Sequence, residues 1–338
     1  MAKNTKTKNK KRPLVVVTRL IPDAGIKLLK KYCRVKINPQ NRQLTPNELK
    51  KFVKGADAIL SLLNDLIDKK VLVAAGQQLK IVANYAVGFD NINIKDARAA
   101  RIYVTNTPNE EIIQTVAEHA FALMIALAHR LVESDNYARA EKYKGWDPLL
   151  FLGVDLYGKT LGIVGLGNIG KAVAQRAVKG FMMKALYYDV KRDRGFEKEF
   201  GAKYVSLKQL LKQSDFITLH VPLIPATKHL ISYPEFKLMK KTAFLVNTAR
   251  GPVVDEKALL KALGTKKIAG AGLDVYECEP AIDCDIRDNL ELKAFPNVVL
   301  TPHTASATIE TRQKMSEVAA VNILDVLIRH KKPRNLVA

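Results

Sequence analysis

Short apolar runs rich in β-branched residues alternate with amphipathic segments along most of the chain. From Pro13 onward, glycine, proline or asparagine separates these runs from one another. Because parallel strands cannot be joined by tight turns, the alternation predicts an α/β fold in which helices connect the strands of parallel sheets. The strands expected in the first set are Leu14–Thr18, Arg34–Ile37, Ala58–Leu63, Lys80–Ala86 and Ile102–Thr105.

A second alternating set follows a long helical pattern that extends from about Glu111 to Arg139. After this set, apolar positions recur at helical spacing from about Thr308 to His330, which predicts a closing amphipathic helix. Two alternating sets in 338 residues predict two doubly wound parallel-sheet domains. The strands expected in the second set are Thr160–Val164, Lys184–Tyr188, Phe216–Leu219, Ala243–Val246, Ala269–Leu273 and Val298–Leu300.

Composition narrows the class of protein. With 48% hydrophobic and 26% charged residues the chain is typical of a globular protein. The apolar stretch Ala120–Ala128 ends at His129, so we expect a buried helix and no membrane anchor. Residues 1–12 are basic and lack the apolar core of a signal peptide, which predicts a disordered tail. The three cysteines argue against a disulfide framework or a metal site and favour the reducing cytoplasm; they are Cys33, Cys278 and Cys284.

The formal net charge is +22, and the basic tail supplies six of these charges. A field of this sign attracts nucleic acids and acidic surfaces. The lysines beyond the tail are scattered, however, and no stretch there interleaves base-stacking aromatic residues with arginines. We therefore favour a solvated lysine-rich surface on a protein whose ligands are anions over a nucleic-acid-binding protein.

A glycine-rich turn, Gly165-Leu-Gly-Asn-Ile-Gly170, lies between an expected strand and an expected helix. A GxGxxG string alone is weak evidence, but this context is the one that a dinucleotide-binding turn requires, because the helix N-terminus faces the pyrophosphate. The residues expected at the cofactor phosphates are Gly165, Gly167, Asn168, Ile169 and Gly170.

Asp189 ends the next expected strand, where an acidic side chain accepts hydrogen bonds from the adenosine ribose. Repulsion between this carboxylate and a 2′-phosphate favours NAD over NADP. Lys191, Arg192 and Arg194 follow closely and weaken that discrimination, so NADP stays open.

Each strand of the second set is followed by residues that can hold a ligand or perform chemistry. Ligands of an open doubly wound sheet bind at the carboxyl ends of the strands, so we expect these residues to line one crevice. We expect His220 to line the cofactor site and Asp274 to lie near the nicotinamide. In strand order the residues are Gly165, Asp189, His220, Asn247–Gly251, Asp274 with Glu279, and His303.

Three of these residues suggest hydride transfer to a carbonyl group. Arg250 carries a permanently charged fork that binds a carboxylate and polarises a carbonyl oxygen. His303 is a natural proton donor, and Glu279 would hold one ring nitrogen and stabilise the imidazolium. Spacing alone does not separate Glu279 from Glu277. Arg250 as a surface ion-pair residue and His303 as a core histidine are the structural alternatives.

Five motifs of the chain match one family, and together they cover Pro13 to about Asn335. On these motifs the chain resembles the D-isomer-specific 2-hydroxyacid dehydrogenases. They are Ala86-Val-Gly-Phe-Asp-Asn91, Gly165-Leu-Gly-Asn-Ile-Gly170, Asn247-Thr-Ala-Arg-Gly251, Gly272-Leu-Asp-Val-Tyr-Glu-Cys-Glu-Pro280 and Thr301-Pro-His-Thr-Ala-Ser-Ala-Thr308.

The resemblance implies an NAD(P)-dependent oxidoreductase acting on a small 2-keto or D-2-hydroxy acid. It implies that Arg250 orients the substrate, that Glu279 rather than Glu277 is the acid of the pair, and that His303 gives or takes the proton. It also implies that the backbone of Ala86, Val87 and Gly88 receives the substrate carboxylate. Thr248 and Ala249, within the arginine motif, are expected at the cofactor.

The resemblance further implies how the domains are connected. A flavodoxin-like substrate-binding domain, residues 13–108 and 305–338, is interrupted by a Rossmann NAD-binding domain, residues 109–304. A helical arm, about residues 111–150, packs against a twofold partner and makes the protein a homodimer. Hinges are expected near Pro108 and Ala305.

Within the family, the segment Trp146–Gly153 and the Ala86–Gly88 loop look most like those of glyoxylate and hydroxypyruvate reductases. Dehydrogenases of the D-3-phosphoglycerate or D-lactate type are the alternatives. A rival of another class is a corepressor-like binding protein on the same scaffold, similar to the C-terminal-binding proteins, which senses NAD. We favour the enzyme.

Overall fold

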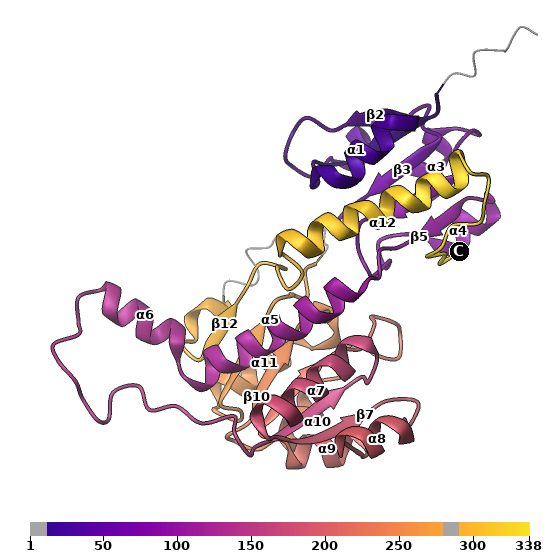
Figure 1. Ribbon diagram of the computed structural model, residues 1–338. Helices are drawn as coiled ribbons and strands as arrows, with labels where there is room; N and C mark the ends of the chain where they lie inside the picture. The colour runs from indigo at the N-terminus through magenta and orange to yellow at the C-terminus, as the bar shows by residue number, and fades with distance from the viewer. Residues whose placement is uncertain (1–11, 280–290) are drawn as a thin grey trace, which may run out of the picture. The chain divides into compact units, whose positions relative to one another are not determined.

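The computed structural model describes residues 12–279 and 291–338. The chain divides into two compact units (Figure 1). Unit 1 consists of Met1–Asn109 and Ile309–Ala338, and unit 2 consists of Glu110–Thr308. That the two junctions act as hinges stays a prediction.

Unit 1 contains a five-stranded sheet in which every pairing is parallel. Its strand order, β2-β1-β3-β4-β5, is that of the flavodoxin-like doubly wound fold. The α/β fold predicted from the alternation is therefore confirmed for this unit. The strands are β1 (Leu14–Val17), β2 (Arg34–Ile37), β3 (Ala58–Ser61), β4 (Ile81–Asn84) and β5 (Tyr103–Thr105).

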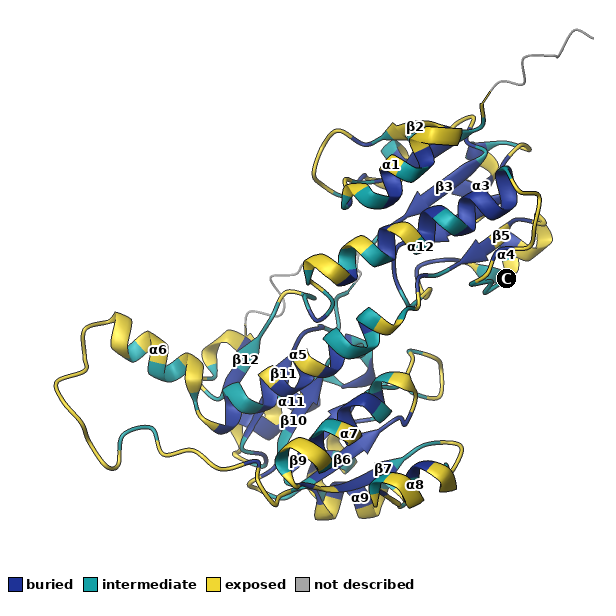
Figure 2. Cartoon of the chain, in the orientation of Figure 1, coloured by how far each residue is buried: buried dark blue, intermediate teal, exposed yellow. Residues whose placement is uncertain are grey.

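Helices cover the sheet of unit 1, and its inner strands β3 and β4 are buried throughout (Figure 2). The last helix of the chain belongs to this unit and packs closely on the first one. A Cβ atom on Gly25 would lie 2.0 Å from the Ser316 carbonyl oxygen, so only glycine permits this approach. The helices are α1 (Asp23–Tyr32), α2 (Pro46–Phe52), α3 (Lys69–Ala75), α4 (Ile94–Ala99) and α12 (Ile309–Leu327).

Unit 2 contains a seven-stranded parallel sheet with the order β12-β11-β10-β9-β6-β7-β8. Counted within the unit, the strand order is that of the Rossmann fold with a further strand at one edge. The order reverses between β6 and β9, which is where such sheets bind ligands. The strands are β6 (Thr160–Val164), β7 (Lys184–Tyr188), β8 (Lys203–Tyr204), β9 (Phe216–Leu219), β10 (Phe244–Asn247), β11 (Gly270–Leu273) and β12 (Val298–Leu300).

The long helical pattern of unit 2 forms two helices instead of one. Arg130 lies between them in the left-handed conformation, with φ of 51°, and its guanidinium binds Glu133 through two hydrogen bonds of 3.0 and 2.6 Å. This turn redirects the chain after Ala128. The helices of unit 2 are α5 (Glu110–Ala128), α6 (Leu131–Arg139), α7 (Asn168–Phe181), α8 (Arg194–Phe200), α9 (Leu207–Gln213), α10 (Tyr233–Leu238) and α11 (Glu256–Gly264).

Helix α5 is long and apolar enough to cross a membrane by length and composition alone. Half of its most apolar window is buried inside the protein. Phe121, Leu123 and Met124 are part of the core cluster that also contains Leu161 and Ile163 of β6. Helix α5 is therefore a core helix of unit 2, as the sequence predicts.

Candidate active site

The three glycines of the turn after β6 have three different environments. Gly165 has φ of +96°, and Gly170 packs so closely that a Cβ atom there would lie 2.1 Å from the Gly165 carbonyl oxygen. Gly167, the N-cap of α7, has no atom within 4 Å of its Cβ position. The turn is therefore closed on its protein side and open at the helix N-terminus, where Asn168 and Ile169 begin α7, and this arrangement fits an anionic pyrophosphate.

Asp189 is tied to this glycine turn. Its carboxylate accepts a hydrogen bond of 2.7 Å from the backbone N–H of Leu166 and one of 3.2 Å from that of Lys191. The side chain is half-buried at the end of β7. Its negative charge thus lies beside the turn, where the ribose of a dinucleotide would be recognised.

His220 and Thr248 follow β9 and β10. The His220 carbonyl would meet a Cβ atom on Gly165 at 2.8 Å, so this residue lies directly against the glycine turn. Burial lowers the pKa of His220 to about 3, and its Nε2 atom lies 2.9 Å from the Thr218 hydroxyl. The buried Thr248 hydroxyl has no hydrogen-bond partner among the described residues. An unpaired buried hydroxyl at the carboxyl end of β10 is consistent with a polar ligand, so the residues present fit a dinucleotide.

The register of three neighbouring strands brings the chemistry-bearing residues to one edge of the sheet. Asn247 pairs with Leu273, and Leu273 pairs with Leu300, at the ends of β10, β11 and β12. Arg250 and His303 lie three residues beyond these paired positions, and Asp274 lies one residue beyond. All follow the carboxyl ends of parallel strands, as the sequence predicts.

The turn that carries Arg250 is closed by Asn247. The Asn247 side chain donates a hydrogen bond of 2.9 Å to the Arg250 carbonyl oxygen and accepts one of 3.0 Å from the N–H of Ala249. The guanidinium of Arg250 donates a hydrogen bond of 2.8 Å to the Ala249 carbonyl oxygen. These bonds fix the backbone from which the guanidinium projects.

Tyr276 connects the Arg250 turn to the loop of His303. A Cβ atom on Gly251 would lie 1.7 Å from the Tyr276 carbonyl oxygen, so the two backbones touch at this glycine. The Tyr276 hydroxyl donates a hydrogen bond of 2.9 Å to the Thr301 carbonyl oxygen. Tyr276 is not predicted from the sequence. The glycine after Arg250 is the only signal there, and the residue that packs against this glycine cannot be identified from the sequence.

His303 and Glu279 form an ion pair in which Nδ1 lies 2.9 Å from Oε2. Their side chains are 24% and 18% exposed, so solvent reaches the pair. His303 has φ of +54°, a strained conformation for a residue with a side chain, and its N–H donates to the Asp274 carbonyl oxygen. The pairing leaves Nε2 of the ring for another partner.

Glu277 is directed to different partners. One of its carboxylate oxygens lies 2.8 Å from Nε2 of His229, and the other accepts a hydrogen bond from the N–H of Glu256 at the start of α11. The geometry therefore separates the two glutamates that spacing left equivalent, because Glu279 alone of the two pairs with His303.

Asp274 fixes the loop that carries His303. Its buried carboxylate accepts hydrogen bonds of 2.6 Å from the Thr301 hydroxyl and of 2.7 and 2.8 Å from the N–H groups of Thr304 and Ala305. Burial acts to raise the pKa of this carboxyl, but the bonds from His119, Thr301 and the two N–H groups outweigh it and lower the pKa below its ordinary value. A contact of Asp274 with the nicotinamide stays a prediction.

His119 of α5 belongs to the same cluster, although the sequence predicts no role for it in the site. Its Nε2 atom lies 3.0 Å from the Thr301 hydroxyl and 3.4 Å from the Asp274 carboxylate. The signal available in the sequence is a histidine directly before the wholly apolar half of this helix, Ala120–Ala128.

The Ala86–Gly88 loop lies in unit 1, directly after β4 and Tyr85. Ala86 is buried, and Val87 and Gly88 are half-buried. The loop therefore presents part of its backbone at the surface of its unit, as an anion-binding role requires.

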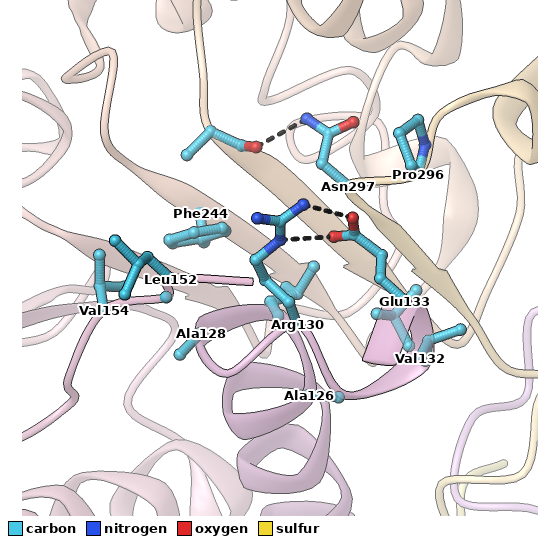
Figure 3. A pocket seen from close by; sticks show the side chains of 14 residues that line it. Ala126, Ala128, Arg130, Val132, Glu133, Leu152, Val154, Phe244, Pro296 and Asn297 are labelled. Carbon is cyan, nitrogen blue, oxygen red and sulfur yellow. Dashed lines mark hydrogen bonds and ion pairs between the residues drawn. The ribbon is translucent and has the colours of Figure 1, made fainter. Parts of the chain in front are cut away.

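A cavity of about 240 Å³ in unit 2 does not coincide with these residues (Figure 3). Phe244, Ala269 and Asn297 line it at the amino ends of β10, β11 and β12, whereas Arg250 and His303 follow the carboxyl ends. Its charged residues, Arg130 and Glu133, are paired with each other. We therefore do not assign this cavity to the chemistry.

The cysteines depart from the sequence interpretation. Cys33 is free and buried, but Cys278 is disulfide-bonded. Cys278 therefore contradicts the prediction that the cysteines form no disulfide. Cys284 lies outside the described residues. Over residues 12–279 and 291–338, no cluster of three potential metal ligands occurs.

Comparisons with known proteins agree with this geometry. Residues 121–305 match the family model described as D-isomer specific 2-hydroxyacid dehydrogenase, NAD binding domain. A glyoxylate reductase of Korarchaeum cryptofilum is 50% identical over 327 residues, 96% of either chain. One of Thermococcus kodakarensis is 48% identical over 93% of this chain and 92% of the relative. The solved structure of an NADPH-dependent glyoxylate/hydroxypyruvate reductase of Sinorhizobium meliloti, in complex with NADP and malonate, is 28% identical, with a TM-score of 0.82 over 97% of each chain.

Proposed function

Because the chain belongs to the D-isomer-specific 2-hydroxyacid dehydrogenases, we propose that it reduces a small 2-keto acid, glyoxylate or hydroxypyruvate, with NAD(P)H. The observation that carries this proposal is the ion pair of 2.9 Å between His303 and Glu279 beside the Arg250 turn. A protonated imidazole next to a carbonyl-polarising guanidinium is what reduction of a ketone or aldehyde needs.

Each residue of the site has a defined task in this reaction. Arg250 binds the substrate carboxylate and polarises the neighbouring carbonyl oxygen. Bound nicotinamide supplies the hydride that C2 of the keto acid accepts. Nε2 of His303 gives its proton to the oxygen, while the Glu279 carboxylate at Nδ1 stabilises the imidazolium. In the oxidation direction, the same Nε2 takes the proton from the hydroxyl group.

We assign the pyrophosphate to the glycine turn, with Gly165, Gly167 and Gly170 shaping it. Asp189 would accept hydrogen bonds from the ribose, and its charge beside the turn favours NADH over NADPH. His220, Thr248 and Ala249 complete the cofactor site, and Asp274 positions the loop of His303 toward it. The Sinorhizobium meliloti relative is NADPH-dependent, so kinetics with both cofactors are needed to establish the preference of this chain.

We further propose that the enzyme is a cytoplasmic homodimer. The arm from the start of α6 to the start of β6 exposes many large apolar side chains, and no residue of α6 is buried. Trp146, with 83% of its surface exposed, is the most exposed aromatic among them. Such a concentration of apolar surface is typical of a protein interface. The exposed residues are Leu131, Val132, Tyr143, Trp146, Leu149, Leu152, Val154 and Tyr157.

Steady-state oxidation of NADH and NADPH, followed by absorbance, tests the proposed function. Glyoxylate, hydroxypyruvate and pyruvate serve as substrates, and Arg250→Lys serves as the damaged variant because a point charge cannot replace the guanidinium fork. We expect turnover of glyoxylate and hydroxypyruvate that Arg250→Lys largely abolishes. A purified protein that binds the dinucleotide and turns over none of these acids would instead be the NAD-sensing binding protein.

A further inference from the structure

The three carbonyl groups of the Ala86–Gly88 loop are all held by hydrogen bonds within unit 1. The Ala86 carbonyl oxygen accepts a hydrogen bond of 2.9 Å from the N–H of Thr107. The Val87 carbonyl oxygen accepts a hydrogen bond of 2.7 Å from Nδ2 of Asn106, and the Gly88 carbonyl oxygen accepts one of 2.9 Å from Nδ2 of Asn84. Two side-chain amides therefore fix the orientation of this short loop.

The fixed carbonyl groups determine where the N–H groups point. In a planar trans peptide the C=O and N–H bonds are directed to opposite sides. Because the carbonyls of Ala86 and Val87 point toward the segment of Asn106 and Thr107, the N–H groups of Val87 and Gly88 point away from it. Neither N–H group has an acceptor among the described residues, and both residues are half-buried.

The two asparagines are themselves held in place. Asn84 is fully buried, and its Oδ1 atom accepts a hydrogen bond of 3.0 Å from the Ser61 hydroxyl. The backbone of Asn106 is bonded to Asn335 at 3.3 Å and to the side chain of Asn322 at 3.4 Å. The side chain of Asn106, in contrast, makes one hydrogen bond within the described part of the chain, to the Val87 carbonyl oxygen. The loop is thus organised before any ligand arrives.

We propose that Asn106 is a positioning residue for substrate binding, because its bond to the Val87 carbonyl turns the N–H group of Gly88 outward, next to that of Val87, as a binding site for the carboxylate of the keto acid. This inference rests on the proposed function and adds to it a residue that sets substrate affinity. Adjacent backbone N–H groups bind anions well, and a preformed arrangement avoids the cost of ordering the loop at each encounter. Asn106 acts through Val87 and touches neither substrate nor cofactor.

Asn106→Ala tests the proposal, because it removes one hydrogen bond from a half-buried side chain and leaves the fold intact. We expect KM for glyoxylate to rise about 10- to 100-fold, the weight of hydrogen bonds to a charged group, with kcat changed less than about threefold. The inhibition constant of oxalate should rise in parallel. NADH affinity, measured by fluorescence titration, should stay within about twofold, since the cofactor residues lie in unit 2. Asn106→Asp should raise KM further, because its carboxylate cannot donate to Val87 and repels the substrate.

Asn93→Ala is the matched control in the same unit. It removes the N-cap of α4, where the Asn93 side chain accepts a hydrogen bond of 3.1 Å from the N–H of Asp96, and it leaves the Ala86–Gly88 loop unchanged. The control should leave KM unchanged even where it lowers the melting temperature more than Asn106→Ala does. A wild-type KM in Asn106→Ala, or an equal rise in Asn93→Ala, overturns the positioning role while glyoxylate turnover still supports the proposed function. A wild-type enzyme without keto-acid turnover overturns both.

Discussion

Nδ1 of His303 lies 2.9 Å from Oε2 of Glu279, although 24 residues separate the two in sequence. The pair is held from both sides: Asp274 binds the backbone after His303, and Tyr276 connects the loop to the Arg250 turn. Because Glu279 occupies Nδ1, only Nε2 is left to exchange a proton with a substrate.

Glu279→Gln keeps the shape of the side chain and removes the charge that stabilises the imidazolium. We expect kcat for glyoxylate reduction to fall about 10- to 10³-fold, within the range that positioned acids and bases contribute. Glu277→Gln is the matched control, since Glu277 binds His229 and the start of α11 instead. Equal losses of kcat in the two variants would show that the His303 pairing has no special role.

Gly167→Ala separates cofactor binding from folding. Its Cβ position is open and its φ of −71° is accessible to alanine, so the fold should tolerate the substitution, with at most a small fall in melting temperature because alanine is a poorer N-cap than glycine. The added methyl group blocks the approach of the pyrophosphate, and we expect the Kd for NADH to rise at least about tenfold. Gly180→Ala, at an equally open position near the end of α7, should change neither NADH binding nor the cofactor KM. If Gly167→Ala bound NADH as tightly as the wild type, the pyrophosphate could not be assigned to this turn.

Asp189→Ala tests the cofactor preference. Loss of the carboxylate removes both a ribose acceptor and the repulsion of a 2′-phosphate, and Lys191, Arg192 and Arg194 remain nearby in sequence. We expect the ratio of kcat/KM for NADH to that for NADPH to fall at least about tenfold. The ratio is its own control, because the bond from Leu166 is lost for both cofactors alike. A ratio that does not move would assign the discrimination to other residues.

We expect Asp274→Asn to change how the stability of the protein depends on pH. The pKa of Asp274 lies below its ordinary value in the folded protein, so its stabilising contribution is present above about pH 4 and is lost as the pH falls through the lowered pKa. At pH 7 the substitution should lower the free energy of unfolding by about 2–4 kcal/mol, because buried N–H donors lose a charged acceptor. Urea unfolding between pH 7 and pH 3 should show a smaller acid-induced loss in the variant than in the wild type. Equal stability at pH 7 would contradict this assignment.

The sequence predicts the parallel sheets and most strands because their pattern is local. The strands Arg34–Ile37, Phe216–Leu219 and Val298–Leu300 begin and end at the residues that the sequence predicts. The break at Arg130 is not predicted, because a left-handed conformation at a residue other than glycine leaves no mark in the apolar pattern. Strand β8 has only two residues, both exposed, so it leaves no apolar run to detect.

The candidate site is less visible in the sequence than the fold. Strand ends identify Arg250 and His303, since their position requires only the order of the sheet. The choice of Glu279 over Glu277, the contact of Gly251 with Tyr276 and the joining of His119 to Asp274 arise from packing between segments far apart in the chain. Such contacts have no periodicity, and the sequence alone does not specify them.

The central claim is that His303 exchanges a proton with a keto acid beside bound NAD(P)H. Single-turnover reduction of glyoxylate by His303→Ala, compared with the exposed control His129→Ala, tests it most directly. The account predicts a rate about 10²- to 10⁴-fold lower in His303→Ala, with NADH affinity unchanged and with His129→Ala like the wild type. Wild-type turnover of glyoxylate and hydroxypyruvate by His303→Ala would contradict it.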